Sequence, residues 1–268
     1  MTGTIHPTAL VDSNAKLGEG VEVGPYAVIG PNVTIGDRTR IGAHAVIEGH
    51  TTLGPDNMIF QFASVGAAPQ DLKYKGEPST LVMGAKNTVR EFVTLHVGTA
   101  AGAMTTRIGD NNLFMANSHV AHDCSVGNNN VFANSVSLAG HVSIMNNVIL
   151  GGLSGIHQYC RIGSYALIGA GAMVGQDVPP YCIGQGDRCV LRGLNLIGLE
   201  RAGMSAAEIG EIKKMYRHLF STVGHLKEKI SSLSPDLAEH PKIKLVLDFI
   251  AQSKRGMISP TKHFRTEE

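Results

Sequence analysis

The sequence predicts an all-β fold with an α-helical tail: a parallel β-helix over residues 1–190, followed by a small α-helical domain over residues 191–268. Three observations predict it. An aliphatic residue recurs at every sixth position, glycine often follows it, and beyond Pro180 the apolar residues change to helical spacing. The composition indicates a narrow core that excludes large rings, because the chain has 32 glycines, no tryptophan and only 5% aromatic residues.

The six-residue period runs without a break from Ile5 to Val65, resumes at Met83 and, shifted by one position, continues from Ile108 to Val174. A small or β-branched residue usually lies four positions after each aliphatic one. Two inward positions in six, separated by a turn, describe one short strand and one corner. Parallel strands stacked in this way form a solenoid whose coils lie about 4.8 Å apart. We expect the glycine after the aliphatic residue to mark a sharp turn of the backbone.

Two polar stretches interrupt the period and are expected to leave the solenoid as loops. They are QDLKYKGEPST, residues 70–80, and GTAAGAMTTR, residues 98–107, and neither contains an inward aliphatic residue. Polar loops on a rigid scaffold frequently carry binding and catalytic residues.

The C-terminal part is expected to be helical. Ser205 and Glu208 form a capping-box pattern, and apolar residues follow at helical spacing: Ile209, Ile212, Met215, Tyr216 and Leu219. Further helices are expected over residues 226–233 and from Pro241, which suits a first helical position. Such helices can cover the open last coil of a solenoid. Residues after Gly256 are expected to be loosely held.

Charge and cysteine spacing exclude several classes of function. A net charge of +1 gives no basic face for nucleic acid. No apolar run of about 18 residues and no secretory signal are present, so we expect a cytoplasmic protein that is not integral to a membrane. The four cysteines form no CxxC pair. Cys124 and Cys160 occupy equivalent inward positions about 9–10 Å apart, which predicts small core residues rather than a disulfide.

The hexad resembles the left-handed parallel β-helix of the hexapeptide-repeat acyltransferases over about residues 5–180. Three hexads per coil then give a triangular prism with about 18 residues per turn. The left-handed winding is implied by this resemblance alone, since parallel crossovers are otherwise right-handed.

An 18-residue coil brings distant histidines to one corner. His122, the pair Gly140 and His141, and the pair His157 and Gln158 begin equivalent turns in successive coils, and His119 ends the preceding hexad. Isolated histidines on outward positions are usually solvated, but four within about 10 Å favour a functional site.

Metal binding and general-base catalysis are the two candidate roles for this corner. Zinc requires about three converging nitrogen ligands, as in the γ-class carbonic anhydrases, whose ligand spacing His119, His122 and His141 do not reproduce. A histidine oriented by a carboxylate can instead take a proton from a hydroxyl group that attacks a thioester. A glycine N–H can stabilise the oxyanion. We therefore favour catalysis without metal or other cofactor.

Six motifs, in order along the chain, resemble the UDP-N-acetylglucosamine O-acyltransferases that open lipid A synthesis: QDLKYKGEP, HVAHDC, LAGHV, GIHQYC, QDVPPYCIGQG and GLNLIGLERAG. The resemblance implies a cytoplasmic homotrimer that moves an (R)-3-hydroxyacyl group from acyl carrier protein to the 3-hydroxyl of UDP-N-acetylglucosamine. It implies that His122 is the general base, Asp123 its orienting partner and Gly140 the oxyanion donor. It further implies substrate-binding roles for Gln70, Asp71, Lys73, His119, His141, His157, Gln158, Asn195 and Arg201, with Asp71 and Lys73 meeting the sugar nucleotide at a neighbouring subunit.

Four positions depart from the family pattern. Ile197 stands where relatives have glutamate and Ala202 where they have a second arginine, so nucleotide contacts there are expected to differ. Ala170 stands at the position that measures acyl length, and Arg188 replaces a histidine. The Ala170 methyl group predicts a shorter preferred acyl chain than a glycine would, since each buried CH₂ contributes about 0.8 kcal/mol.

Residues 200–268 contain 12 of the 23 lysines and arginines, including Lys213, Lys214 and Arg217, which indicates a docking surface for an acidic carrier protein. The alternative is a solvated helix face.

Other classes of function remain open. One is a UDP-3-O-acylglucosamine N-acyltransferase, although the hexads begin at Ile5 and leave no room for its N-terminal uridine-binding domain. The others are a zinc-dependent hydratase and an ice-binding solenoid, which would show regular threonine ladders.

Overall fold

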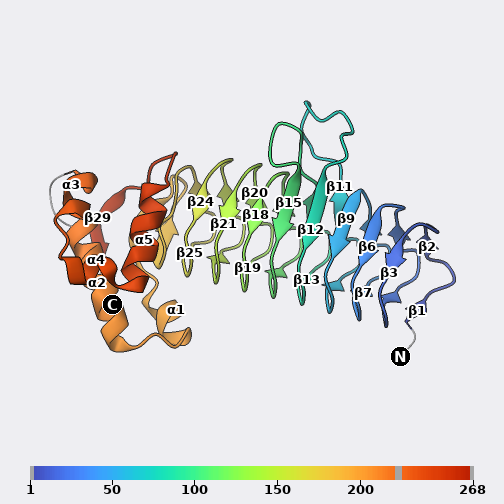
Figure 1. Cartoon of the computed structure of the whole chain (residues 1–268), viewed down its shortest axis with the longest axis horizontal. Coiled ribbons are helices and arrows are strands. Elements are labelled where there is room, and N and C mark those ends of the chain that lie inside the picture. The colour runs from blue at the N-terminus through green and yellow to red at the C-terminus, as the bar shows by residue number, and fades with distance from the viewer. Residues whose placement is uncertain (1–2, 221–224, 266–268) are drawn as a thin grey trace.

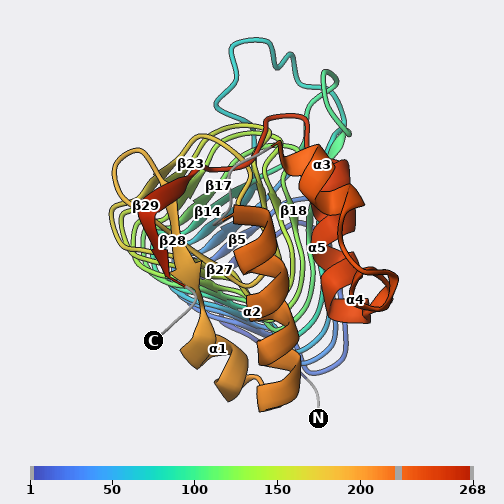
Figure 2. The same ribbon diagram turned by 90° about the vertical axis from the view of Figure 1, so that its left-hand side faces the viewer.

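The computed structural model confirms the β-helix and the helical region that follows it (Figure 1). It describes residues 3–220 and 225–265, with the backbone alone for 261–265. Three sheets of mostly parallel strands form the walls of a triangular prism, and the helices lie at its C-terminal end (Figure 2).

The strands alternate between the three sheets in chain order. Sheet A contains β1 (Thr4–Ile5), β4 (Glu22–Val23), β7 (Arg40–Ile41), β10 (Met58–Ile59), β13 (Thr88–Val89), β16 (Leu113–Phe114), β19 (Val131–Phe132), β22 (Ile149–Leu150), β25 (Leu167–Ile168), β27 (Cys182–Gln185), β28 (Val190–Leu194) and β29 (Pro260–Arg265). Sheet B contains β2 (Leu10–Val11), β5 (Val28–Ile29), β8 (Val46–Ile47), β11 (Ser64–Ala67), β14 (Thr94–His96), β17 (His119–Val120), β20 (Ser137–Leu138), β23 (Gly155–Ile156) and β26 (Met173–Val174). Sheet C contains β3 (Lys16–Leu17), β6 (Val33–Ile35), β9 (His50–Leu53), β12 (Thr80–Met83), β15 (Thr105–Ile108), β18 (Ser125–Val126), β21 (Ser143–Ile144) and β24 (Arg161–Ile162).

The coil length follows from the strand register. Ile5 pairs with Val23, and Val120 pairs with Leu138, so equivalent residues lie 18 positions apart. Where no loop interrupts it, each coil therefore consists of three hexads, as the family resemblance implies. The backbone N–H and C=O groups of each short strand bond to the coils on either side, which satisfies polar groups that a two-residue strand could not satisfy alone.

The repeat glycines do not mark the sharp turns of the backbone that the sequence predicts. Positive φ occurs three positions after the inward aliphatic residue, for example at Tyr26 (57°) and His44 (56°). Of the described glycines directly after an inward aliphatic residue, Gly66 in β11 alone has a positive φ (86°), and most of the others instead face the next coil closely. A Cβ on Gly36 would lie 2.6 Å from the Gly54 carbonyl carbon, and one on Gly42 would lie 2.7 Å from the Gln61 nitrogen. Close stacking of coils, rather than backbone curvature, requires these glycines.

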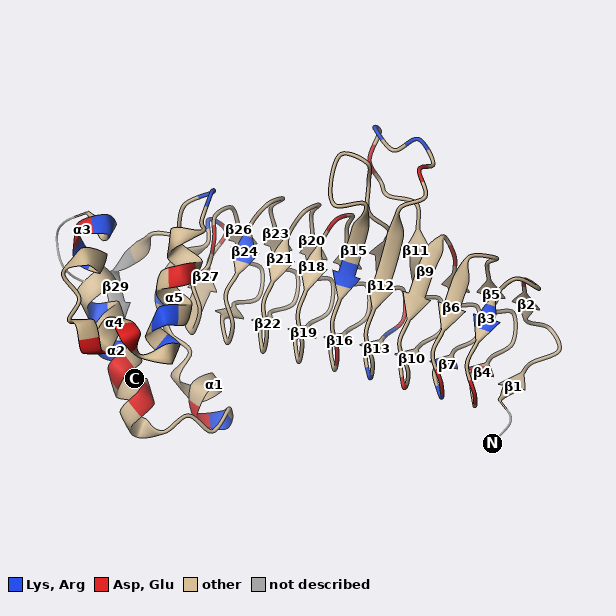
Figure 3. Cartoon of the chain, viewed as in Figure 1, with Lys and Arg blue, Asp and Glu red and all other residues tan. Residues whose placement is uncertain are grey.

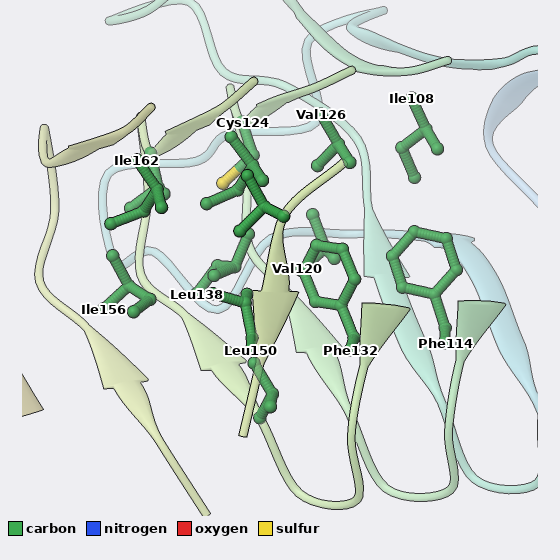
Figure 4. Packing of buried hydrophobic residues seen from close by; sticks show 14 of the residues in the cluster. Ile108, Phe114, Val120, Cys124, Val126, Phe132, Leu138, Leu150, Ile156 and Ile162 are labelled. Atoms are coloured by element: carbon green, nitrogen blue, oxygen red, sulfur yellow. The ribbon is translucent and has the colours of Figure 1, made fainter. Parts of the chain in front are cut away.

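The core consists of the inward aliphatic residues, with a few aromatic rings where the period allows them (Figure 4). Phe114 and Phe132 pack in consecutive coils with ring centroids 4.6 Å apart. All four cysteines are buried and free, which confirms the predicted role of Cys124 and Cys160 as small core residues. Burial raises the pKa of the Cys124 thiol to about 12, so it stays protonated at neutral pH.

One corner of the core is polar, which the aliphatic pattern does not predict. Buried asparagines replace small apolar residues in successive coils and form a ladder. The Asn57 side-chain oxygen accepts a hydrogen bond from the Asn87 backbone N–H (2.8 Å), and that of Asn87 accepts one from the Asn112 N–H (2.9 Å). Asn130 continues the ladder. Each amide satisfies a backbone group that would otherwise be buried without a partner.

Two loops leave the prism at the corner between sheets B and C, on the same side of the molecule (Figure 1). The first loop (residues 68–79) joins β11 to β12, and the second loop (residues 97–104) joins β14 to β15. Their C-terminal ends differ from expectation, because Thr80 begins β12 and residues 105–107 belong to β15. Glu77 in the first loop accepts a hydrogen bond from the Ala100 N–H in the second (2.8 Å), so the loops support each other.

The C-terminal region contains α1 (Leu196–Arg201), α2 (Ala206–Phe220), α3 (Leu226–Ser231), α4 (Pro235–Glu239) and α5 (Pro241–Ala251). The predicted capping box is present, with the Ser205 N–H donating to Glu208 (2.8 Å). The five predicted apolar residues of α2 are buried. Tyr216 donates to the Pro180 carbonyl oxygen (2.6 Å), which fixes α2 on the last coil. The helices α1 and α4 are not predicted by the sequence pattern.

The expectation of loosely held residues after Gly256 is wrong for residues 257–265, and residues 266–268 lie outside the described part of the chain. Strand β29 returns to the prism and pairs in parallel with β28, which itself pairs antiparallel with β27. Hydrogen bonding to the edge of sheet A therefore holds this segment in place. Over the two described ranges, no helix combines the length and apolar character needed to cross a bilayer.

The contacts of the repeat glycines predict different effects on stability for two substitutions at equivalent positions. Gly36→Ala should lower the free energy of unfolding by about 1–3 kcal/mol, since its Cβ would overlap the next coil. Gly175→Ala, where a Cβ meets no atom within 4 Å, should change it by about 0.5 kcal/mol or less. Chemical denaturation of the two variants tests this, and equal stabilities would contradict the close-stacking explanation.

Candidate functional site

One corner of the prism gathers most of the chemically active side chains. His122 and Asp123 lie in the turn between β17 and β18, and Gly140 and His141 lie in the equivalent turn of the next coil, between β20 and β21. Both loops leave the prism at this same corner. The 18-residue register is thus what brings these residues together from different hexads.

Asp123 holds the His122 ring from one side. Its Oδ2 lies 2.9 Å from His122 Nδ1. The left-handed backbone at Asp123 (φ 58°) turns its carboxylate toward the second loop, where it is buried. There Thr99 donates its hydroxyl hydrogen to Oδ2 (2.6 Å) and its N–H to Oδ1 (3.2 Å), and the Ala103 N–H also donates to Oδ1 (2.8 Å). A Cβ on Gly102 would collide with the carboxylate, so the loop needs glycine there.

These hydrogen bonds decide the charge of Asp123. Burial alone would raise the pKa of the carboxyl group, but the hydrogen bonds from Thr99 and His122 outweigh it and leave the pKa below its ordinary value. Asp123 is therefore a carboxylate at neutral pH. An ionised partner on Nδ1 fixes the tautomer that carries the proton on Nδ1 and leaves the lone pair on Nε2.

The Nε2 side of His122 faces Gly140 and the first loop. A Cβ on Gly140 would lie 2.6 Å from Nε2, so only glycine permits this approach. The Gly140 N–H has no hydrogen-bond acceptor among the described residues. Asp71 in the first loop places its Oδ2 3.9 Å from Nε2 of the same chain. A free backbone donor and a second carboxylate thus flank the open nitrogen of the imidazole.

Two aromatic contacts keep His141 beside His122. The rings of His122 and His141 meet edge to face with centroids 5.1 Å apart, and His141 stacks on Tyr159 at 4.5 Å. Desolvation lowers the pKa of His141, so this ring is mainly neutral at pH 7. Tyr159 was not predicted, although its position one coil after His141 is the signal that could have identified it.

A second pair of histidines lies beside this corner on sheet B. His119 Nδ1 lies 2.7 Å from the Thr94 hydroxyl oxygen, and its ring meets that of His96 edge to face at 4.8 Å. His96 is only 4% exposed, and desolvation lowers its pKa to about 4. Its Nδ1 is buried without a partner. Sequence reasoning missed His96, because it precedes the second loop and breaks the hexad there.

A mostly apolar groove of about 650 Å³ runs along the outer face of sheet B from His119. Its lining includes His157 and, at the far end, Arg188. The groove joins two predicted substrate-binding residues to one of the predicted length-determining residues.

A second cleft of about 970 Å³ lies on sheet A, away from His122. Arg201, Ile197 and Ala202 line it. Asn195 also lies there, but its amide is already used, accepting from the Gly198 N–H (3.2 Å) and donating to the Tyr165 carbonyl oxygen (2.9 Å). Its side chain caps α1 instead of pointing free into the cleft.

The remaining predicted residues are exposed. Gln70 and Lys73 lie on the first loop, and Gln158 lies at the corner one coil after Gly140. Ala170 lies on a different corner, between sheets A and B, and is not part of the groove lining.

The donor set suits a proton-transfer site better than a metal site. His122, Asp123 and His141 have potential ligand atoms within 4.8 Å of one another. This set contains Asp123 in place of His119, one of the candidate zinc ligands in the sequence. However, both Asp123 oxygens already accept hydrogen bonds from the second loop. An imidazole with a carboxylate on one nitrogen and an open second nitrogen can act as a general base.

Comparisons with known proteins agree with this geometry. The family model described as "Udp N-acetylglucosamine O-acyltransferase; Domain 2" matches residues 177–258, and the model for bacterial transferase hexapeptides matches residues 14–49 and 105–140. An acyl-[acyl-carrier-protein]–UDP-N-acetylglucosamine O-acyltransferase of Myxococcus xanthus is 58% identical over 253 residues, covering 94% of this chain and 98% of the relative. One from a Janthinobacterium species is 48% identical, with coverage of 95% and 98%.

Solved structures of UDP-N-acetylglucosamine acyltransferases have the same fold. The structure from Moraxella catarrhalis is 43% identical, has a TM-score of 0.92, and matches over 95% of this chain and 99% of its own. The one from Francisella novicida is 37% identical, with a TM-score of 0.93 and coverage of 97% and 95%.

The buried His96 predicts a loss of stability on acidification. Its pKa is about 4 in the folded chain and about 6.5 when unfolded, so the unfolded state binds more protons between these values. The stabilisation is complete above about pH 6.5 and declines as pH falls toward 4, by up to about 3 kcal/mol. His96→Gln, which cannot be protonated, should weaken this pH dependence, whereas the exposed His50→Gln should not. Denaturation midpoints between pH 4 and 7 test this, and parallel pH profiles for the wild type and His96→Gln would contradict it.

Proposed function

Because this chain belongs to the UDP-N-acetylglucosamine O-acyltransferase family, we propose that it transfers an (R)-3-hydroxyacyl group from acyl carrier protein to the 3-hydroxyl of UDP-N-acetylglucosamine. This reaction is the first step of lipid A biosynthesis. The observation that carries the proposal is the His122 ring held at Nδ1 by a buried carboxylate, with Nε2 open beside a free backbone N–H.

The chemistry follows from that arrangement. His122 Nε2 takes the proton of the sugar 3-hydroxyl group while the oxygen of that hydroxyl group attacks the thioester carbonyl carbon. The imidazolium that forms is stabilised by Asp123 and, at 3.9 Å, by Asp71. The Gly140 N–H stabilises the tetrahedral oxyanion. When the C–S bond breaks, the imidazolium returns its proton to the carrier thiolate. The mechanism uses no metal and no other cofactor.

The substrate-binding regions are assigned to the surfaces around the His122 corner. The groove is lined by His119 and by Ala139, the residue before Gly140, and is mostly apolar, so it suits the acyl chain. Asp71, Lys73 and Gln70 on the first loop suit the hydroxyl groups of the sugar, together with His141. His157 and Gln158 border the acyl side.

The nucleotide is assigned to the sheet A cleft. Arg201 supplies a guanidinium that can pair with the diphosphate, and Asn195 supports it by capping α1. The cleft and His122 lie on different walls of the prism, so one chain does not bring them together. The wall of a second copy would have to complete the site.

Apolar residues on the outer face of sheet A and aromatic rings at the corner between sheets A and B support a homotrimer. The outward residues of sheet A form an apolar stripe through five consecutive coils, in register from Leu113 to Ile183. At the corner between sheets A and B, the rings of Tyr26, His44, Phe62 and Phe92 stack at 5.0–5.2 Å while largely exposed. Outward residues on sheet C are mainly polar. A threefold arrangement in which sheet A meets sheet B of the next copy covers both apolar surfaces and leaves sheet C in water.

The trimer predicts a specific sensitivity to charge on sheet A. A Val131→Asp, Ile149→Asp double variant should lower the mass in solution, since each carboxylate would be buried against the next copy. Thr52→Asp, on exposed sheet C, should leave the mass unchanged. Light scattering after size exclusion measures this. A monomeric wild-type protein, or a double variant that keeps the wild-type mass, would contradict the arrangement.

The carrier protein is assigned to the C-terminal helices, where charged residues gather beside a sparsely charged prism (Figure 3). Lys214 already pairs with Glu211 (2.7 Å), so its contribution to docking is reduced. We expect the reaction in the cytoplasm, which agrees with four free thiols.

His122→Ala should lower kcat by about 10²-fold or more, the usual effect of removing a general base. Mass spectrometry of products from defined 3-hydroxyacyl carrier proteins and UDP-N-acetylglucosamine measures this, with a chelator present to exclude a metal contribution. His50→Ala serves as the control, because His50 is exposed on sheet C. Near-normal turnover by His122→Ala would assign the base to another residue, and loss of wild-type activity with chelator would favour the hydratase-like metal site.

A further inference from the structure

Arg192 is an extra residue in β28 that the strand pairing skips. Across the antiparallel pair of β27 and β28, Leu191 lies opposite Gly184 and Gly193 lies opposite Ile183, so Arg192 forms a β-bulge between two paired positions. Such a bulge bends the strand locally and redirects a side chain, and bulges are frequent beside functional sites. Leu191 and Gly193 are buried, whereas Arg192 is exposed and lines the cleft on sheet A.

The guanidinium groups of Arg192 and Arg201 both line this cleft and are both free to bind a ligand. Among the described side chains, neither guanidinium has an ion-pair or hydrogen-bond partner. Arg38, by contrast, pairs with Asp56 at 2.7 Å. Guanidinium N–H groups that bind no protein acceptor keep their donors for an anionic ligand.

The cleft therefore carries a positive charge that no carboxylate opposes. Among the described residues that line it, none is acidic. Its uncharged polar side chains are four amides and one phenol: Asn129, Asn147, Gln185, Asn195 and Tyr165. Because the whole chain has a net charge of only +1, two free guanidinium groups in one cleft are a local excess that attracts anions.

The two arginines are held on a fixed frame. Arg192 belongs to β28, which pairs with β27 on one side and β29 on the other. Arg201 belongs to α1, which follows β28 directly. The Asn195 N–H donates to the Tyr181 carbonyl oxygen (2.7 Å), and its side-chain amide donates to the Tyr165 carbonyl oxygen (2.9 Å), so the start of α1 is tied to the last coil. A site that is ordered in advance loses less entropy when a ligand binds.

We propose that Arg192 is a phosphate-binding residue of this protein, which together with Arg201 holds the diphosphate of the nucleotide sugar. The inference rests on the proposed function, and it adds a residue that neither the six-residue repeat nor the sequence motifs include. Each phosphate of a nucleotide sugar carries one negative charge at neutral pH, so two guanidinium groups match the two charges. An arginine can bind a phosphate through two parallel hydrogen bonds, which fixes the orientation of the diphosphate as well as its position.

Steady-state kinetics at low and at high ionic strength test this. Arg192→Gln should raise KM for UDP-N-acetylglucosamine about 10-fold at low ionic strength, the usual effect of losing a hydrogen bond to a charged group. The factor should be smaller at high ionic strength, because salt screens the lost ion pair. The values of kcat and of KM for the carrier protein should stay within about twofold.

Two further variants complete this experiment. Arg192→Lys keeps the charge but loses the planar fork, so it should raise KM for UDP-N-acetylglucosamine about threefold. Arg107→Gln is the matched control and should leave it unchanged, because Arg107 is an exposed arginine of β15 on sheet C and lies outside the cleft.

The possible outcomes separate the two proposals. A wild-type protein that neither binds UDP in calorimetric titration nor acylates UDP-N-acetylglucosamine contradicts the proposed function itself. If the wild type binds UDP and Arg192→Gln binds it with the same Kd, Arg192 is not a phosphate ligand. The proposal is also overturned if only KM for the carrier protein rises, which would assign Arg192 to docking, or if KM for the nucleotide sugar rises by equal factors at both ionic strengths, which would assign it a structural role. If Arg192→Gln fails to fold, as circular dichroism would show, Arg192→Lys decides, and an unchanged KM overturns the proposal.

Discussion

The fixed 18-residue register between hydrogen-bonded coils is the constraint on which the rest of the structure depends. Strands of two residues have too few contacts to persist alone, so each coil is ordered by those above and below it. The same register stacks equivalent side chains about 4.8 Å apart. Residues far apart in sequence, such as His122 and Gly140, therefore become neighbours without any long-range packing of a conventional core.

The regular part of the fold could be predicted because every coil needs a buried aliphatic residue at the same inward positions. The aliphatic residues from Ile29 to Val174 obey it, and they are buried. The purpose of the repeat glycines could not be predicted, since close approach and positive φ both favour glycine and only coordinates separate them. Strand β29 was missed because its partner is an edge strand and its own sequence has no six-residue period.

The candidate site likewise contains residues that could be predicted from the sequence and residues that could not. Residues placed by the register, including His122, Asp123 and Gly140, were identified from spacing and family resemblance. Residues placed by the loops were not. Thr99 and Gly102 lie in a stretch of small residues with no periodic signal, yet they surround the Asp123 carboxylate and help to keep it ionised. A loop that leaves the repeat and returns to it carries information that no periodic pattern contains.

The prism also explains why the predicted site residues do not all meet within one chain. A flat wall can present a row of side chains, but it cannot enclose a ligand by itself. The corner that carries His122 lies between sheets B and C, whereas Arg201 lies beside sheet A. A ligand that needs both must lie between two walls that face each other, and within one convex prism no two walls do. A wall of such a scaffold can therefore enclose an extended ligand only where loops cover it, as the two loops do at His122, or where another molecule packs against it.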